Sequence, residues 1–274
     1  ARRQRKEEKV GQKEATVELH PAYPDLPSFV WLLNDSHLGS VCTDYDAFLE
    51  DYRVCKETPN FYCVTNGDEI DNFMVDFHPS GIYEDPISPE EQALMLKGLM
   101  KDLDDDNRLL AMSFGNHNDA YLRSGVSFEG LWLREMKCPI FSSGGLLTMK
   151  LGSQEYKMAL THKFWGQSKL NPTNACKRYL DFIYPEADVV YLAHYHTKEH
   201  LSFIRAKQEK IGICGGTYKL DDEFAAKQGI GDRGQRGGMV LELKPDKKEM
   251  RVWDRPMEAR KYMKMMLELK AMRS

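Results

Sequence analysis

The chain has 274 residues, 42% of them hydrophobic and 29% charged, and a formal net charge of −4. These fractions are ordinary for a soluble globular enzyme, and no stretch approaches the roughly 18 apolar residues of a membrane span, which argues against a membrane protein. The length predicts one large domain or two small ones, with enough chain to bury a sizeable core.

Charge is distributed unevenly along the chain. Residues 1–14 carry six Lys and Arg against three Glu, and residues 255–274 carry six against two, so the ends sum to +3 and +4 and the middle to −11. An acidic middle is what a carboxylate-containing cation site would help produce, whereas basic ends could contact nucleic acid. Solvated tails are the simpler alternative for each end.

The cysteines and the N-terminal segment bear on the cellular compartment of the protein. Six cysteines lie scattered with no CxxC spacing, which fits reduced thiols better than a disulfide framework or a cysteine zinc site. The basic segment 2–6 has no apolar region behind it, so it does not read as a secretory signal. We expect a cytoplasmic protein.

We expect the polar residues 1–26 to form a basic arm or an early edge strand. Five apolar runs then have the length of buried strands, and each is followed by residue types that bind metals. The runs are 29–33, 61–64, 109–114, 158–160 and 189–192, followed by Asp35 and His37, Asp68, Asn116 and His117, His162, and His194 and His196. Because α/β sheets place their sites at the carboxyl ends of strands, these residues predict a single pocket.

The remaining elements follow from capping and periodicity. Ser88 as N-cap and Pro89 at the first position predict a helix over 89–102, and a second helix is expected from about 171 to 184. Four β-like runs, 201–205, 210–214, 239–243 and 250–253, predict a second sheet. The Met-rich segment 257–274 predicts a helix that packs on the core or joins two copies in a homodimer. The central domain would then span 27–256.

The strand-ending residues have the chemistry of a centre with two divalent cations. Such a centre needs several carboxylate, imidazole and amide ligands and one carboxylate that bridges both ions. Asp35 and His37 are separated by one residue, so that two ligands of alternating direction lie on one turn, and His194 and His196 have the same spacing. Gly67 would let the backbone turn sharply beside Asp68.

In this order the motifs resemble the calcineurin-like metallophosphoesterases. That family carries Asp-x-His, Gly-Asp-x-x-Asp, Gly-Asn-His, a lone His and His-x-His. Here they read Asp35-Ser36-His37, Gly67-Asp68-Glu69-Ile70-Asp71, Gly115-Asn116-His117, His162 and His194-Tyr195-His196. The sequence departs from the family at two places, where Asn118 replaces a frequent acid and Ala193 a usual glycine. Neither departure removes a ligand.

The resemblance implies a fold, a ligand set and a mechanism. The fold would be α/β, with two packed mixed β-sheets flanked by helices in four layers. Asp35, His37 and His196 would bind one cation, Asn116, His162 and His194 the other, and Asp68 would bridge them. A bridging hydroxide would attack phosphorus while His117, oriented by the Asp71 carboxylate, assists the leaving group. Manganese is our first expectation for the metal, with iron or zinc as alternatives.

The substrate is left open by the sequence. The segment Asp35-Ser36-His37-Leu38-Gly39 is most similar to the DNA exonuclease and phosphodiesterase branch of the family, which favours a nuclease. Tyr121, Arg123 and Trp165 would contact the substrate, because aromatic rings stack on bases and Arg binds phosphate.

Two alternatives remain for the activity. The chain could act on small phosphoesters such as nucleotides, with His78 and Tyr83 in the pocket wall. It could also be a scaffold that kept the fold without catalysis. Retention of all the predicted ligands and of His117 argues against the scaffold, because buried polar clusters are costly to keep.

Overall fold

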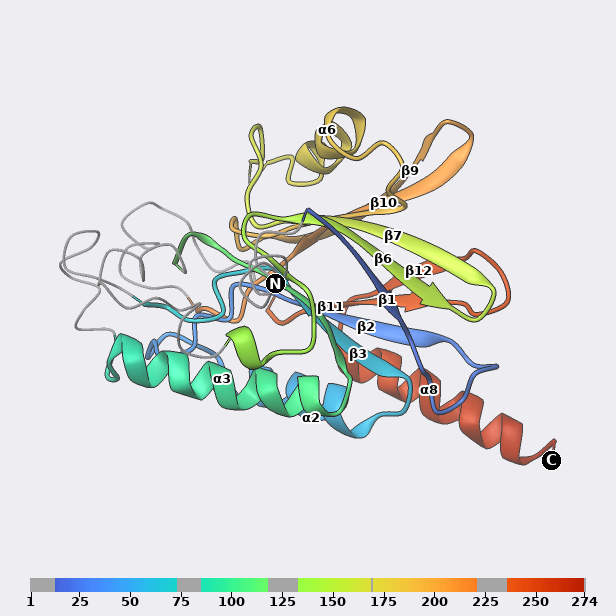
Figure 1. Ribbon diagram of the computed structural model, residues 1–274, viewed down its shortest axis with the longest axis horizontal. Coiled ribbons are helices and arrows are strands. Elements are labelled where there is room, and N and C mark those ends of the chain that lie inside the picture. The colour runs from blue at the N-terminus through green and yellow to red at the C-terminus, as the bar shows by residue number, and fades with distance from the viewer. Residues whose placement is uncertain (1–12, 73–84, 118–132, 169, 221–235, 274) are drawn as a thin grey trace, which may run out of the picture.

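The computed structural model describes residues 13–72, 85–117, 133–168, 170–220 and 236–273. Twelve strands in this part of the chain form two six-stranded sheets, ordered β1-β6-β7-β8-β10-β9 and β12-β11-β2-β3-β4-β5 (Figure 1). The strands are β1 Glu14–Glu18, β2 Ser28–Leu33, β3 Phe61–Thr65, β4 Leu109–Ser113, β5 Ile140–Phe141, β6 Gly145–Leu151, β7 Gln154–Thr161, β8 Val189–Leu192, β9 Lys198–Arg205, β10 Gln208–Gly215, β11 Met239–Leu243 and β12 Met250–Trp253. The helices are α2 Tyr45–Glu57, α3 Pro89–Asp105, α6 Asn174–Phe182 and α8 Pro256–Ala271, with a 3-10 turn at Leu133–Glu135.

Three apolar clusters show that the molecule has four layers. Side chains such as Val30, Leu147 and Tyr191 fill the space between the two sheets. A second cluster joins the outer face of the β2-containing sheet to α2, α3 and α8, and a third joins the other sheet to α6. Figure 1 shows the same order, with α6 on one side of the paired sheets and the other helices opposite. The predicted fold class is therefore confirmed.

The N-terminus of α3 follows the sequence prediction. The hydroxyl of Ser88 accepts from the main-chain N–H of Glu91, and the Glu91 carboxylate accepts from the N–H of Ser88, a reciprocal capping box. Pro89 occupies the first turn, where its missing N–H costs nothing. This helix connects β3 to β4, which places both strand ends at the same edge of the sheet.

The last four strands are divided between the two sheets, which differs from the prediction. We expected the four runs after His196 to form one second sheet, but β9 and β10 extend the sheet of β8, whereas β11 pairs with β2 and β12 pairs with β11. Both faces of β11 are buried, Val240 toward the helices and Leu241 toward the other sheet. A strand with two apolar faces belongs inside a sheet, which is why it lies beside β2.

The two ends of the described chain pack onto this core. Of the two possibilities considered for the first 26 residues, residues 14–18 form an edge strand, β1, which is parallel to β6. Helix α8 buries Ala259 and Met263 against the helical face of the β2-containing sheet, and Met265, Leu269 and Met272 are exposed. Among the described residues, no helix has the length and hydropathy needed to cross a bilayer.

Candidate metal centre

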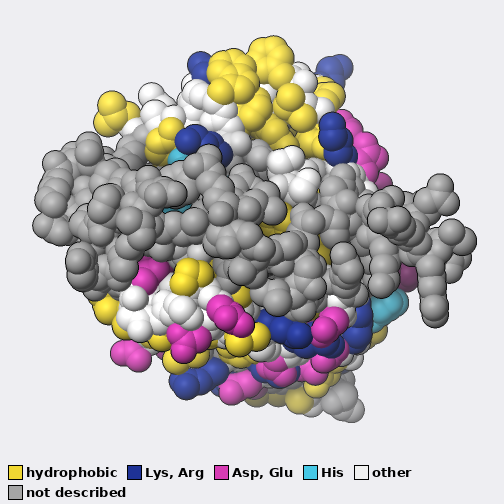
Figure 2. Space-filling view, turned by 60° about the vertical axis from the view of Figure 1, so that its left-hand side comes forward, with side chains coloured by type: hydrophobic (Ala, Val, Ile, Leu, Met, Phe, Trp, Pro, Cys, Tyr) yellow, Lys and Arg dark blue, Asp and Glu magenta, His cyan; other side chains and the backbone are white. Residues whose placement is uncertain are grey.

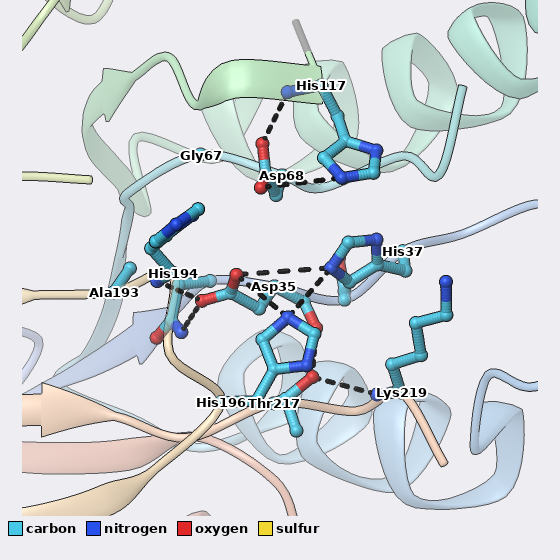
Figure 3. Close-up of polar contacts among 12 residues, drawn as sticks. Asp35, His37, Gly67, Asp68, His117, Ala193, His194, His196, Thr217 and Lys219 are labelled. Carbon is cyan, nitrogen blue, oxygen red and sulfur yellow. Dashed lines mark hydrogen bonds and ion pairs between the residues drawn. The ribbon is translucent and has the colours of Figure 1, made fainter. Parts of the chain in front are cut away.

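The loops that follow β2, β3, β4, β7 and β8 meet at one edge of the sandwich. Figure 3 shows polar side chains from the loops after β2, β3, β4 and β8 gathered there. The convergence itself was predicted, but we had expected it at the edge of a single sheet. Instead β2, β3 and β4 come from one sheet and β7 and β8 from the other. The candidate site therefore lies across the join between the two sheets.

The loops after β2 and β3 remain paired beyond their strands. The N–H groups of Asp35 and His37 donate to the carbonyls of Gly67 and Asp68 at 3.0 and 3.1 Å, and Leu38 continues the ladder with Glu69. Gly67 has φ +88°, and a Cβ there would collide with the backbone of Gly115, so the predicted sharp turn is present. This pairing fixes the two loops relative to each other.

Five of the predicted ligands have left-handed backbone conformations. Their φ angles are 44° for Asp35, 46° for His37, 53° for Asp68, 76° for His194 and 54° for His196. Non-glycine residues seldom adopt positive φ, and when they do the strain is concentrated at functional sites. In both loops the left-handed residues alternate, at 35 and 37 and again at 194 and 196.

The first cluster contains Asp35, His37 and His196, whose ligand atoms all lie within 4.8 Å of one another. The two imidazole Nε2 atoms are 3.1 Å apart, and that of His196 lies 3.3 Å from Asp35 Oδ1. The other carboxylate oxygen, Asp35 Oδ2, is held by the main-chain N–H of His194 at 2.9 Å. One oxygen is thus fixed by the protein and the other is presented to the cluster.

The second cluster contains Asp68, His162 and His194. His162 Nε2 lies 2.9 Å from Asp68 Oδ2, and its Nδ1 is 2.8 Å from the carbonyl of Asn66. Because a carbonyl only accepts, Nδ1 carries the proton, and Nε2 is turned toward Asp68. The predicted assignment of three residues to the first cation corresponds to one cluster, and the bridging role of Asp68 stays a prediction.

The residues after β4 occupy the rim of the site. Asn116, the predicted amide ligand, is exposed, and His117 is partly buried. The main-chain N–H of His117 donates to Asp68 Oδ1 at 2.8 Å, and its Nε2 lies 4.0 Å from Asp68 Oδ2. Gly115 leaves the space that the Asp68 carboxylate occupies.

Asp71 acts differently from our expectation. We predicted that its carboxylate orients His117, but it is the main-chain carbonyl of Asp71 that accepts from His117 Nδ1. The carboxylate instead contacts His37 Nδ1 at 2.6 Å and Lys219 Nζ at 2.9 Å. Both oxygens of this carboxylate are paired with Lys219, which accounts for its position beside His37.

Four polar residues of the site were missed by sequence reasoning: Asn34, Asn66, Thr217 and Lys219. Asn66 Nδ2 donates to the carbonyls of Thr161 and Tyr191, both at 3.1 Å, and so ties β3 to the other sheet. Thr217 Oγ1 donates to the carbonyl of Asp35 at 2.7 Å. Asn34 and Asn66 each directly follow a buried strand, a signal that could have identified them.

The donor set fits divalent cations. Within the described part of the chain, Asp35 Oδ1 is buried without a hydrogen bond. Burial lowers the pKa of His37 and His194 to about 4, so both imidazoles are neutral at pH 7 and able to act as ligands. Burial also opposes charge on His162, yet Asp68 raises the pKa of His162 to about 10. The buried carboxylates thus favour a positive charge in the cluster, which a metal ion would supply.

The predicted substrate contacts are only partly described. Trp165 is 61% exposed on the loop after β7, and Phe164 beside it packs against Tyr179. Buried Gln167 donates to the carbonyl of Ala193 at 2.6 Å, which holds this loop beside the loop of His194. Tyr121 and Arg123, as well as His78 and Tyr83, lie outside the described residues.

Comparisons with known proteins found only distant similarities, all of them to solved structures. No family model matches the sequence, and no curated protein matches it. The structure is similar to vacuolar protein sorting 29 from Cryptosporidium parvum, with 13% identity, a TM-score of 0.44, and coverage of 84% of this chain and 98% of that one. It is also similar to a conserved uncharacterized protein, a predicted phosphoesterase, from Streptococcus pneumoniae, with 14% identity, a TM-score of 0.35, and coverage of 83% and 98%. The sulfate thiohydrolase SoxB from Thermus thermophilus has 10% identity, a TM-score of 0.36, and coverage of 91% and 61%. Because these TM-scores are below 0.5, the fold class rests on the observed strand order and not on these similarities.

Proposed function

We propose that this chain is a hydrolase that cleaves phosphoesters with the help of divalent cations. The observation that carries the proposal is the pair of adjoining clusters, Asp35, His37 and His196 beside Asp68, His162 and His194, at the meeting edge of two sheets. Mixed imidazole and carboxylate donors without thiolate suit manganese, iron or zinc. Bound cations in such a centre supply Lewis acidity toward phosphoryl oxygens and lower the pKa of water.

The side chains around the clusters have separate tasks in this proposal. Asp35 and Asp68 would supply negative charge to hold the cations, and the imidazoles of His37 and His194, neutral at pH 7, would add nitrogen donors. His117 lies on the exposed rim with Nδ1 directed to the Asp71 carbonyl and Nε2 toward the cluster. From that position Nε2 can deliver a proton to the leaving oxygen, a contribution worth roughly 10²- to 10⁴-fold.

Phosphodiester bonds in DNA are the substrate that we propose, and the surface beside the site supports this. Exposed Lys163 follows His162 directly, and the Arg178 guanidinium lies 4.9 Å from the centre of the Trp165 ring. Phe182 stacks on Trp165 with ring centres 6.2 Å apart. Figure 2 shows hydrophobic side chains gathered over the α6 end of this face with Lys and Arg at their margins. Aromatic rings mixed with cations are typical of single-stranded nucleic acid binding.

Hydrolysis assays test the proposal. Wild type, Asp68→Asn and His117→Ala are compared on bis-p-nitrophenyl phosphate, p-nitrophenyl phosphate, a labelled linear duplex and a labelled single strand, with manganese or with EDTA. We expect manganese-dependent cleavage of the diester and of DNA that is lost in both variants. Trp165→Ala should weaken cleavage of DNA but not of the small diester, because the ring lies outside the metal clusters.

The outcomes separate the three candidate functions. Diester cleavage without DNA cleavage would favour a small-molecule phosphodiesterase or phosphatase and would remove DNA from the proposal. Metal binding without hydrolysis of any of the four substrates would favour the scaffold. Activity that survives in Asp68→Asn would contradict the assignment of the site.

A further inference from the structure

A buried lysine lies next to the first cluster and has no role in the function proposed above. Lys219 follows β10, and its side chain is 4% exposed. Its Nζ lies 2.9 and 3.2 Å from the two carboxylate oxygens of Asp71. A buried charge pair of this kind is costly to desolvate, so its position beside predicted metal ligands calls for an explanation.

The backbone around Lys219 is fixed to the loop that carries Asp35. Tyr218 N–H and Thr217 Oγ1 both donate to the carbonyl of Asp35, at 3.1 and 2.7 Å. The N–H of Lys219 then donates to Thr217 Oγ1 at 2.9 Å, as Figure 3 shows, and Lys219 forms an isolated antiparallel bridge with Thr43. The ammonium group is therefore brought to Asp71 from a rigid segment.

The Asp71 carboxylate connects Lys219 to His37. Its Oδ1 lies 2.9 Å from Lys219 Nζ and 2.6 Å from His37 Nδ1. An acceptor on Nδ1 fixes the ring and turns Nε2 toward His196 and Asp35, where a metal would be bound. Without the ammonium, the carboxylate would have one fewer partner holding it beneath the ring.

We propose that Lys219 is a positioning residue for the candidate metal centre: by holding the Asp71 carboxylate, it orients His37 as a ligand. This inference rests on the proposed function only in requiring that the site binds divalent cations. Lys219 does not serve as a contact for the phosphate, because its side chain is buried and its ammonium is engaged by both oxygens of Asp71.

A second buried lysine provides a matched control. Lys210, near the start of β10, is 3% exposed and lies 3.6 Å from Asp188, at the opposite end of the strand from the site. Removing either ammonium leaves a buried carboxylate short of a partner, and both changes should destabilise the fold. Only the change at Lys219 should affect metal binding.

Calorimetric titration of the metal-free protein with manganese tests the inference without reference to hydrolysis. We expect Lys219→Met to bind manganese about 10- to 100-fold more weakly than wild type, the usual cost of losing a residue that supports a metal ligand. Lys219→Arg, which keeps the charge, should recover most of the affinity, and Lys210→Met should bind as wild type does. Thermal unfolding of each variant confirms that it is folded, and Lys219→Gln replaces Lys219→Met if the latter is not.

Each outcome counts for or against the inference. Wild-type affinity in Lys219→Met would overturn it, as would an equal loss in Lys210→Met, which would indicate general loosening. A wild-type protein that binds no manganese, zinc or iron would overturn it together with the metal centre. A protein that shows the expected affinities but hydrolyses none of the phosphoesters would leave the role of Lys219 intact and would remove only the proposed function.

Discussion

The strands of the β7-β8-β10 sheet carry buried polar groups at both ends, and the two ends are built differently. At the amino end, the Asp188 carboxylate accepts from the N–H of Lys157 at 2.9 Å and pairs with Lys248 at 2.8 Å and Lys210 at 3.6 Å. Nearby, the hydroxyl of Tyr156 lies within hydrogen-bond distance of the carbonyls of Lys244 and Lys247, at 2.7 and 2.9 Å. Each of these polar groups has partners within the protein.

The carboxyl end combines strain with a polar atom that the protein does not satisfy. Five predicted ligands there have positive φ, and Asp35 Oδ1 lacks a hydrogen bond within the described residues. Strain and unsatisfied groups each cost on the order of 1–3 kcal/mol. Buried polar groups at the amino end are thus paired within the fold, whereas those at the carboxyl end have the strain and the unpaired oxygen that the proposed metal site would account for.

The sharpest way to break this comparison is to neutralise one carboxylate at each end. Asp68→Asn keeps a residue that tolerates positive φ, and we expect manganese-dependent hydrolysis to fall on the order of a thousandfold, with a loss of stability in the metal-free protein because buried His162 loses its charged partner. Asp188→Asn should keep its hydrolysis rate within about twofold but lose about 3 kcal/mol, because Lys210 is then left buried beside a neutral amide. Initial rates and urea unfolding measure both. The reverse pattern would refute the division of roles.

A change on the rim should affect one step of the reaction and not the binding of metal. His117→Ala should lower the hydrolysis rate by roughly a hundredfold or more, because Nε2 no longer protonates the leaving oxygen. The loss should be larger for an alkyl ester than for a p-nitrophenyl ester, since p-nitrophenolate leaves without a proton. Manganese affinity should be unchanged, and an equal loss on both esters would argue against the leaving-group role.

A third buried carboxylate, on α2, sharpens the comparison through pH. Burial raises the pKa of Asp51 to about 6, against the hydrogen bond that it accepts from the Tyr218 hydroxyl at 2.7 Å. The folded protein thus favours the neutral acid. The stability that this preference contributes is fully present at pH values below the ordinary pKa of 3.8, and it is lost as the pH rises through about 6. The total is on the order of 3 kcal/mol.

Asp51→Asn tests that sign. Its amide oxygen can still accept from Tyr218, but it does not ionise. Urea unfolding at a series of pH values should show a decline between pH 4 and 7 that is steeper in wild type than in the variant. A parallel decline in both proteins would assign the pH dependence to other groups.

The smallest effect is expected at the amino end of the sheet. Tyr156→Phe removes a hydroxyl that links β7 to the turn between β11 and β12 and should cost about 1 kcal/mol of stability. Hydrolysis should not change, because the hydroxyl is at the opposite end of β7 from His162. A drop in activity that exceeds the loss of stability would show that the two ends are coupled.

The sequence by itself predicted the elements whose apolar runs and caps are local. The strand at Val189–Leu192 and those at Met239–Leu243 and Met250–Trp253 have the predicted bounds, and α3 begins at the predicted proline. Helix α2 was missed, because its buried apolar residues Phe48, Val54 and Cys55 are interrupted by charged side chains, among them buried Asp51. Strand β6 was missed as well, although it forms a hairpin with β7 through the two residues Gly152 and Ser153, a local signal that could have identified it.

The same division holds for the candidate site. The residue types after the strands predicted a cation site, because five groups of carboxylates, amides and imidazoles that each end a buried run are poorly explained by chance. Only the tertiary structure decided that the predicted ligands come from two sheets, that the Asp71 carboxylate contacts His37, and that Lys219 reaches this carboxylate from a segment about 150 residues away in sequence. Spacing along the chain determines which side chains can share a loop, whereas packing determines which loops share a site.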